Sequence, residues 1–355
     1  MASIRSASSV SAGVMALPGD VAPLAHGGDL SAARALFPGA PEPFLDLSAG
    51  INPNPYPIAH FSSDWFTHLP EPGEVPRLAA IAAEAYGAPS AEHVVVTPGS
   101  QIAVAQAVAL VPTGSAAVLG PTYAEHARTA RLAGHEIIEA ASLEQMADAS
   151  HAIAVNPNNP DGRILAKDAL LALADRLRQH GGLLIVDEAF MDASSRDESL
   201  AAEVGRGNMV ALRSFGKFFG LPGLRLSFAL TSPKIAAELA AALGPWPVSG
   251  AALAIGAKAL ADKAWIEKTR GALVASARRL DAALIQAGLQ VVGGTSLFRL
   301  VRTAKAEALF GHLGEAGIFV RRFPEQPTWL RFGLPGREQD WRRLSAALRS
   351  AGKQS

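Results

Sequence analysis

Short apolar runs rich in β-branched residues alternate with alanine- and leucine-rich stretches from about residue 92 onward. The short runs predict strands, and the longer stretches between them predict helices. Strands are expected at 94–97, 116–119, 136–139, 152–155, 183–186, 210–213 and 224–230, with helices at about 100–110, 124–132 and 167–179. Strands that are apolar along their whole length are typical of a parallel sheet with both faces covered. The sequence therefore predicts an α/β fold whose mostly parallel, seven-stranded sheet lies between helices.

The pattern changes after about residue 250. An alanine-rich helical region runs to about residue 287; strand-like segments follow at 290–301, 318–323 and 329–332, and helices at 304–316 and 339–351. These elements predict a smaller α+β domain. The first 45 residues are rich in glycine and proline and show no strong period. We therefore expect an N-terminal segment (1–45) near the active site, a large ligand-binding domain (46–250) and a small C-terminal domain (251–355).

Composition excludes several classes of protein. The absence of cysteine rules out disulfides, iron–sulfur clusters, thiolate zinc sites and a cysteine nucleophile. Thirty-two basic residues balance thirty-two acidic ones, so no nucleic-acid or membrane partner is predicted. No apolar run reaches the roughly 18 residues that a membrane-spanning helix needs. The N-terminal stretch is interrupted by serine and glycine and ends in Pro-Gly, so we interpret it as a loose leader on a cytoplasmic chain.

Searches for several common catalytic motifs fail. The nine histidines show no paired metal-ligand spacing, so no metal site is predicted. The chain has no phosphate-binding loop of the G-x-x-x-x-G-K-[ST] type, no dinucleotide fingerprint after the first strand, and no G-x-S-x-G motif. What remains is a series of short motifs, each at a predicted strand end: TPGSQ (97–101), PTY (121–123), NPNNPDG (156–162), VDEAF (186–190), SFGKFFGLPGLR (214–225) and LRFG (330–333). Ligands of open α/β sheets bind beyond the carboxyl ends of strands, so these motifs predict one shared site.

Two of the motifs carry groups suited to a phosphate. Gly99, Ser100 and Gln101 lie where a strand turns into a helix, so backbone N–H groups and the helix dipole would face an anion. Ser214 and Arg225 add a hydroxyl and a guanidinium, which can grip a phosphate with paired hydrogen bonds. The sequence therefore predicts an anion site held by a local cluster.

Other motif residues suit a flat, cationic heterocycle. Asp187 ends a buried strand, where a carboxylate is costly without a cationic partner such as a protonated pyridine nitrogen. Tyr123 offers a ring for stacking, and Asn159 offers a donor for a phenolic oxygen. Lys217 supplies an amine that can form a covalent link to an aldehyde.

From about residue 26 to the end, these residues resemble the fold-type-I family of pyridoxal-phosphate (PLP) enzymes, especially its histidinol-phosphate aminotransferase-like branch. The resemblance implies PLP as cofactor, linked through Lys217, with Asp187 on the pyridine nitrogen, Asn159 on the ring O3′ and Tyr123 stacked on the ring. It also implies a homodimer with the site at the subunit interface. The cofactor phosphate would be held by Gly99, Ser100, Gln101, Ser214 and Arg225, and the substrate carboxylate by Arg331.

The segments HGGDL (26–30), LDLSAGINP (45–53) and VDEAFMD (186–192) are further similar to threonine-phosphate decarboxylases of cobalamin biosynthesis. That group converts L-threonine O-3-phosphate to (R)-1-aminopropan-2-yl phosphate and carbon dioxide. The resemblance implies a small phosphorylated amino acid as substrate. Its contacts would come from His26, Gly27, Gly50, Asn52, Arg321 and Arg331.

Two alternatives remain at this point. The cofactor motifs do not separate a decarboxylase from an aminotransferase that acts on histidinol phosphate or a similar amino acid. The HGG segment favours the decarboxylase, as does Phe190, which stands where aminotransferase relatives have tyrosine. The second alternative is a non-catalytic PLP-fold sensor or regulator. The chain has neither a basic helix-turn-helix extension nor a lost Lys217.

Some of these residues also have ordinary structural explanations. NPNNPDG is a typical turn sequence, His26 could cap a turn, and Arg331 could pair with a surface acid. We interpret Glu188 as structural. The segment HLPEP places Leu69 where relatives commonly have a tyrosine that reaches the partner's cofactor phosphate. Either another residue such as Tyr56 makes that contact, or the phosphate has one ligand fewer.

Overall fold

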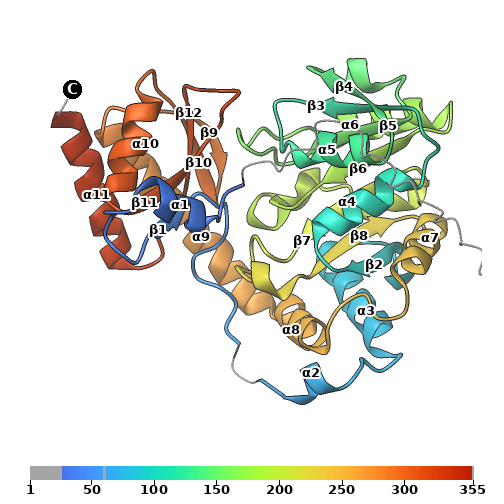
Figure 1. Ribbon diagram of the computed structural model, residues 1–355. Coiled ribbons are helices and arrows are strands. Elements are labelled where there is room, and N and C mark those ends of the chain that lie inside the picture. The colour runs from blue at the N-terminus through green and yellow to red at the C-terminus, as the bar shows by residue number, and fades with distance from the viewer. Residues whose placement is uncertain (1–25, 59–60, 354–355) are drawn as a thin grey trace, which may run out of the picture.

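The computed structural model describes residues 26–58 and 61–353, and two sheets organise it (Figure 1). The larger sheet has the order β2-β8-β7-β6-β5-β3-β4. Its strands are β2 (Val94–Thr97), β3 (Ser115–Leu119), β4 (Glu136–Ala140), β5 (His151–Val155), β6 (Leu183–Asp187), β7 (Met209–Ser214) and β8 (Ser227–Thr231). Neighbouring strands from β4 to β7 are parallel, and only β8 runs antiparallel to its neighbours. The predicted mostly parallel, seven-stranded sheet is confirmed.

Each face of this sheet is buried under helices because the strands are apolar on both sides. Ile153 and Ile185 pack on the face covered by α4 (Ser100–Ala109), α5 (Glu125–Leu132) and α7 (Pro233–Leu243). Leu184 and Val186, one residue out of phase, pack on the opposite face beneath α3 (Glu74–Tyr86), α6 (Lys167–Arg178) and α8 (Gly250–Ala261). The strand periodicity of two therefore fills two separate cores.

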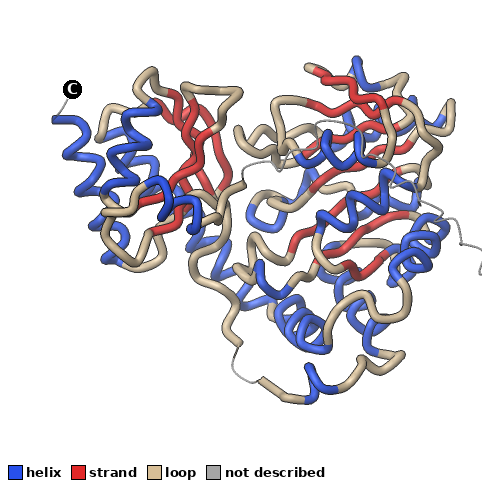
Figure 2. Tube along the Cα trace, viewed as in Figure 1, coloured by secondary structure: helices blue, strands red, loops and turns tan. Residues whose placement is uncertain are grey.

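A second sheet forms the small domain, with the order β1-β11-β12-β10-β9 (Figure 2). Its strands are β1 (Leu45–Leu47), β9 (Gln290–Thr295), β10 (Phe298–Arg302), β11 (Ile318–Arg322) and β12 (Trp329–Gly333). Its helices are α9 (Lys263–Gln286), α10 (Ala306–Glu315) and α11 (Glu338–Lys353). The segment 290–301, which the sequence presents as one strand-like run, is a hairpin of β9 and β10.

The N-terminal segment departs from the expected domain boundary at residue 45. After α1 (Leu30–Leu36), strand β1 pairs in parallel with β11, so that Leu45 lies opposite Ile318. Residues 45–47 therefore belong to the small sheet, although the large domain was expected to begin at residue 46. A three-residue strand is too short to show a period, and its partner lies far away in the sequence. The expectation of a loose leader falls on residues 1–25, which lie outside the described residues.

Two further details complete the fold. The strand expected at 224–230 begins only at Ser227, because Pro222–Leu224 forms a short 3-10 turn and Arg225 adopts a left-handed conformation (φ 52°). The short helix α2 (Asp64–Thr67) lies in the segment that leads to α3. Within the described residues, no helix combines the length and apolar character needed to cross a membrane.

Candidate active site

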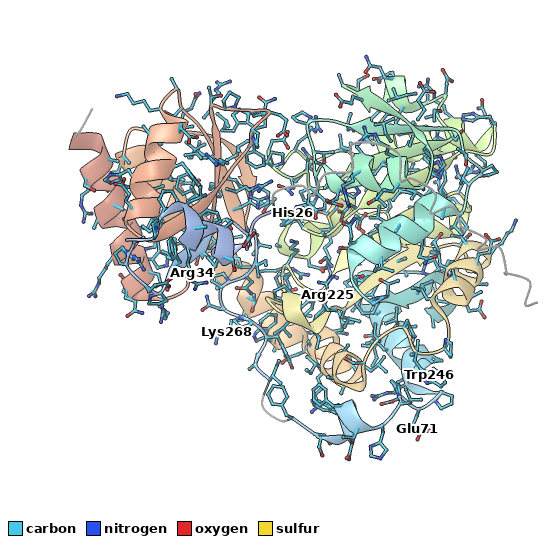
Figure 3. The ribbon with its side chains drawn as sticks, viewed as in Figure 1. His26, Arg34, Glu71, Arg225, Trp246 and Lys268 are labelled. Atoms are coloured by element: carbon cyan, nitrogen blue, oxygen red, sulfur yellow. The ribbon has the colours of Figure 1, made fainter. Side chains whose placement is uncertain are left out.

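A cavity of about 330 Å³ is lined by residues of both domains at the carboxyl ends of the large-sheet strands. Figure 3 shows two of these residues, His26 and Arg225, where the domains meet. With one exception, the cavity contains every residue predicted for the site. These are His26, Gly27, Gly50, Gly99, Ser100, Gln101, Tyr123, Asn159, Asp187, Ser214, Lys217, Arg225, Arg321 and Arg331.

The exception is Asn52, and the expectation that it binds substrate is wrong. Asn52 is only 2% exposed and does not line the cavity. Its amide donates to the backbone oxygen of Phe218 (2.9 Å), and its backbone N–H donates to that of Lys217 (3.0 Å). Its side-chain oxygen accepts from the N–H of Asn54 (2.9 Å). The side chain is therefore fully used in holding the loop that carries the lysine.

The anion cradle forms where β2 turns into α4. Gly99 caps the helix with a φ of +97°, a conformation that favours glycine. The guanidinium of Arg225 lies against Gly99, where a Cβ would touch it and displace it. Ser100 begins the helix, whose first N–H groups have no acceptor within the helix itself. The start of α4, the guanidinium of Arg225 and the hydroxyl of Ser214 all line the same cavity. Together they fit a phosphate group.

Lys217 is held between buried aromatic residues that fix its loop. Phe215, Phe218 and Phe219 are almost completely buried, and Phe215 and Phe219 stack with centroids 4.2 Å apart. Lys217 Nζ lies 5.6 Å from the ring centroid of Phe190. Burial lowers the pKa of Lys217 from 10.5 to about 8, and the positive charge of Arg331 contributes in the same direction. The amine is thus prepared to act as a nucleophile near neutral pH.

Asp187 ends β6 in a buried position and has an unpredicted partner. Its Oδ2 lies 3.1 Å from Nε2 of His126, and its Oδ1 accepts from the N–H of Ala189 at 2.9 Å. The His126 ring packs edge-on against Tyr123, with centroids 5.6 Å apart. Burial, together with the charges of Glu125 and Asp187, raises the pKa of Tyr123 to about 12. The signal that could have identified His126 is its place three residues after Tyr123, in the first turn of a helix.

Arg331 reaches the cavity from β12 and is only 7% exposed. Its Nη2 donates to the backbone oxygen of Ser48 (2.6 Å) and its Nη1 to Oδ1 of Asn159. Its Nε is buried without a hydrogen-bond partner among the described residues. Burial and the neighbouring Arg321 lower the pKa of Arg331 to about 10. A buried guanidinium with an unused donor fits a carboxylate ligand.

Glu188 and Leu69 lie away from this chemistry. Glu188 is completely buried and forms an ion pair with Arg213 (3.1 Å), as expected of a structural residue. Leu69 is 66% exposed and is not part of the cavity. Across the described residues, no group of three or more His, Cys, Asp or Glu side chains is arranged to hold a metal ion.

The residues present fit PLP. An activated amine (Lys217), a buried carboxylate (Asp187), an aromatic ring (Tyr123) and a phosphate cradle around Arg225 line one cavity. Gly99 leaves room for the guanidinium of Arg225 beside the start of α4.

Comparison with known proteins supports the same assignment. Residues 75–348 match the family described as aminotransferase class I and II. A threonine-phosphate decarboxylase from a Sinorhizobium species is 42% identical over 333 residues, covering 92% of this chain and 98% of that protein. A second threonine-phosphate decarboxylase, from Pseudomonas aeruginosa, is 41% identical, covering 92% and 97% of the two chains.

Solved structures share the fold. Histidinol-phosphate aminotransferase from Sinorhizobium meliloti, in complex with pyridoxal-5'-phosphate, matches with a TM-score of 0.78 at 22% identity, over 87% of this chain and 90% of that one. L-threonine-O-3-phosphate decarboxylase from Porphyromonas gingivalis matches with a TM-score of 0.70 at 20% identity, over 87% and 99% of the two chains. Family, fold and cavity agree. The chain therefore belongs to the class I and II aminotransferase family of PLP-dependent enzymes.

Proposed function

We propose that the protein decarboxylates L-threonine O-3-phosphate to (R)-1-aminopropan-2-yl phosphate, a reaction of cobalamin biosynthesis. The observation that carries the proposal is the set of cationic groups in the cavity beyond the phosphate cradle, namely Arg331, Arg321 and His26. A substrate with both a carboxylate and a phosphate needs such a set. The names of the two relatives that match almost the whole chain agree with this reaction.

The chain's own residues would divide the work as follows. PLP, when bound, withdraws electrons from the α-carbon of the attached amino acid. Lys217 is the residue that would hold PLP covalently through its amine, and the same amine would move a proton at the substrate Cα. A pKa of about 8 suits it to giving and taking that proton. Asp187 would pair with the pyridine nitrogen, and the contact of Asp187 with His126 fixes the carboxylate. Tyr123 would stack on the ring, and Asn159 would donate to its O3′.

The outcome depends on how the cavity orients the groups on the substrate α-carbon. Decarboxylation would break the bond between the α-carbon and the carboxylate, whereas amino transfer would break the bond to hydrogen. Arg331 binds the carboxylate, while Arg321 and His26 bind the distal phosphate. Binding energy from the phosphate can thereby set the rotation at the reacting carbon.

An aminotransferase acting on histidinol phosphate or a similar amino acid is the second candidate, because the cofactor-side residues serve both reactions. The two are separated by incubating the purified protein with PLP and threonine phosphate, without a 2-oxo acid. Release of carbon dioxide and the amino alcohol phosphate supports decarboxylation. Amino transfer that depends on glutamate, without gas release, supports the alternative. The non-catalytic alternative has little support, because Lys217 is present and its pKa is lowered.

We also propose that the protein is a cytoplasmic homodimer. Large apolar side chains that a monomer would leave in water support the dimer: Phe66 (66% exposed), Leu69 (66%) and Trp246 (54%). Light scattering on the purified protein, before and after Phe66→Glu, tests the assembly. A mass of one chain at micromolar concentration would contradict it.

A further inference from the structure

Glu125, which the sequence analysis did not single out, is a buried carboxylate beside the cavity. It is 6% exposed. Its Oε1 lies 3.1 Å from Nε2 of His26, and its Oε2 accepts from Gln101 and from Arg128, each at 3.2 Å. Glu125 thus ties the N-terminal segment, through His26, to α4 and α5. The His26 ring also packs against Tyr123, with centroids 5.8 Å apart.

This contact determines what His26 can offer a ligand. A carboxylate only accepts hydrogen bonds, so Nε2 of His26 must carry the hydrogen. In the neutral ring Nδ1 is then a lone-pair acceptor, which would repel an anionic oxygen. In the charged ring Nδ1 becomes a donor.

The charges that line the cavity identify the group that His26 would face. The cradle around Arg225 suits the cofactor phosphate, and Arg331 suits the carboxylate. A phosphorylated amino acid brings one more anion. Among the described residues, the cations left in the cavity wall are Arg321 and His26. His26 is therefore placed to bind the substrate phosphate only in its charged form.

We propose that Glu125 is a positioning residue for the substrate phosphate, because its hydrogen bond fixes Nε2 of His26 and leaves Nδ1 as the ring atom that can donate to the phosphate. The inference rests on the proposed function and extends it to a residue outside the cavity lining. If the inference is correct, replacing Glu125 and replacing His26 should weaken anion binding to a similar extent.

Other charged groups lie around His26 and Glu125. Arg128 donates to the far oxygen of Glu125 at 3.2 Å. Gln101, from α4, is uncharged. Arg321 in β11 and Glu325, which follows that strand, line the same cavity and carry opposite charges. The groups across the cavity are Tyr123, Asp187, Lys217, Arg225 and Arg331. Glu125 is the charged side chain that the structure places in direct contact with the ring.

The test measures sulfate binding to the PLP-loaded protein by titration calorimetry. Sulfate mimics a phosphate ester but keeps its charge over the pH range in which imidazoles titrate. At about pH 6, Glu125→Gln and His26→Gln should each weaken sulfate binding roughly tenfold, the usual scale for a hydrogen bond to a charged group. The double variant should be no weaker than either single one, since both act on one contact.

Two comparisons keep the result specific. L-Threonine, which lacks the phosphate, should bind all variants within about twofold of the wild type, whereas a merely structural role would weaken both ligands equally. Glu139→Gln, an exposed glutamate on β4, is the matched control and should leave both affinities unchanged. Should Glu125→Gln unfold, His26→Gln still tests the claim, because its side chain is 43% exposed.

Unchanged sulfate affinity in Glu125→Gln or in His26→Gln overturns the inference, as does an equal loss for sulfate and L-threonine. The proposed function fails separately. If both variants lose sulfate binding but the wild type releases no carbon dioxide from threonine phosphate, the proposed anion site is supported and the decarboxylase function is rejected.

Discussion

Asn159 and Arg331 come from different domains and are hydrogen-bonded to each other, with Nη1 of Arg331 donating to Oδ1 of Asn159. Asn159 follows β5 of the large sheet, and Arg331 lies in β12 of the small one. The contact joins the side chain proposed for the cofactor ring to the one proposed for the substrate carboxylate. Arg331 uses the amide oxygen of Asn159, so the amide N–H groups remain able to donate to the ring O3′. We therefore predict that substrate binding and cofactor contact are coupled through Asn159.

Asn159→Ala tests this coupling. The variant removes the acceptor of Arg331 and the proposed O3′ contact together, so both substrate affinity and the absorbance of bound PLP should change. We expect kcat/KM to fall about tenfold or more, since a hydrogen bond to a charged group is lost. Steady-state kinetics and an absorbance spectrum of the loaded protein measure the two effects. A raised KM with an unaltered spectrum would contradict the coupling.

The low pKa of Lys217 predicts the pH dependence of PLP uptake. Only the neutral amine attacks the aldehyde, so the uptake rate of the cofactor-free protein should rise with pH and level off above about 8. A lysine with the ordinary pKa would level off only above 10.5. Because the charge of Arg331 lowers the pKa of Lys217, Arg331→Met should move the midpoint to higher pH. Stopped-flow absorbance gives the rates, and Lys217→Ala is the blank. A midpoint unmoved by Arg331→Met would refute the electrostatic explanation.

Phe190→Tyr tests the effect of an apolar ring beside the cofactor. Phe190 lines the cavity and cannot donate a hydrogen bond to O3′. A phenol at this position would stabilise the deprotonated cofactor linkage, so the visible band should titrate at lower pH in the variant than in the wild type. An absorbance titration of both proteins measures the midpoints. A wild-type midpoint equal to or lower than that of Phe190→Tyr would contradict the prediction.

A buried histidine pair far from the cavity predicts acid sensitivity. His151 is fully buried, neither ring nitrogen has a hydrogen-bond partner among the described residues, and His135 packs edge-on at 4.3 Å. Burial lowers the pKa of His151 from 6.5 to about 4. Between pH 4 and 6.5 the unfolded chain therefore binds a proton at His151 that the folded chain does not bind. The contribution of His151 to the free energy of unfolding is complete above pH 6.5 and decreases as the pH falls toward 4.

His151→Phe should remove up to about 3 kcal/mol of this acid dependence, the equivalent of the shift in pKa. Urea unfolding of both proteins at several pH values between these limits measures it. His68→Phe, at a histidine whose side chain is 73% exposed, is the matched control and should leave the slope unchanged. Parallel slopes for wild type and His151→Phe would contradict the assignment.

The large sheet could be predicted from the sequence because most of its strands are continuous apolar runs, and several of them are followed by a polar motif. Parallel strands place these motifs at one edge of the sheet. For this reason the sequence alone predicts that Lys217, Asp187 and Arg225 belong to one site. The N-terminal strand and the Gln290–Arg302 hairpin were missed, since short strands carry little periodicity and glycine at 293 and 294 blurs the turn.

The site residues that sequence analysis missed or misassigned act through contacts that no local pattern shows. His126 and Glu125 sit on a helix whose other positions are ordinary, and their importance comes from partners 61 and 99 residues away. Asn52 lies in a motif that resembles a substrate-binding segment. Its amide nevertheless donates to the backbone oxygen of Phe218, which is 166 residues further along the chain. Such pairings are decided by tertiary packing.

The pairing of β1 with β11 also constrains how the chain can be made. Leu45–Leu47 leaves the ribosome well before its partner Ile318–Arg322. The strands of the large sheet, from Val94 to Thr231, lie between the two and can associate first. Strand β1 must therefore remain unpaired until β11 has been synthesised. The wall of the cavity that carries His26 is completed only when these two distant strands meet.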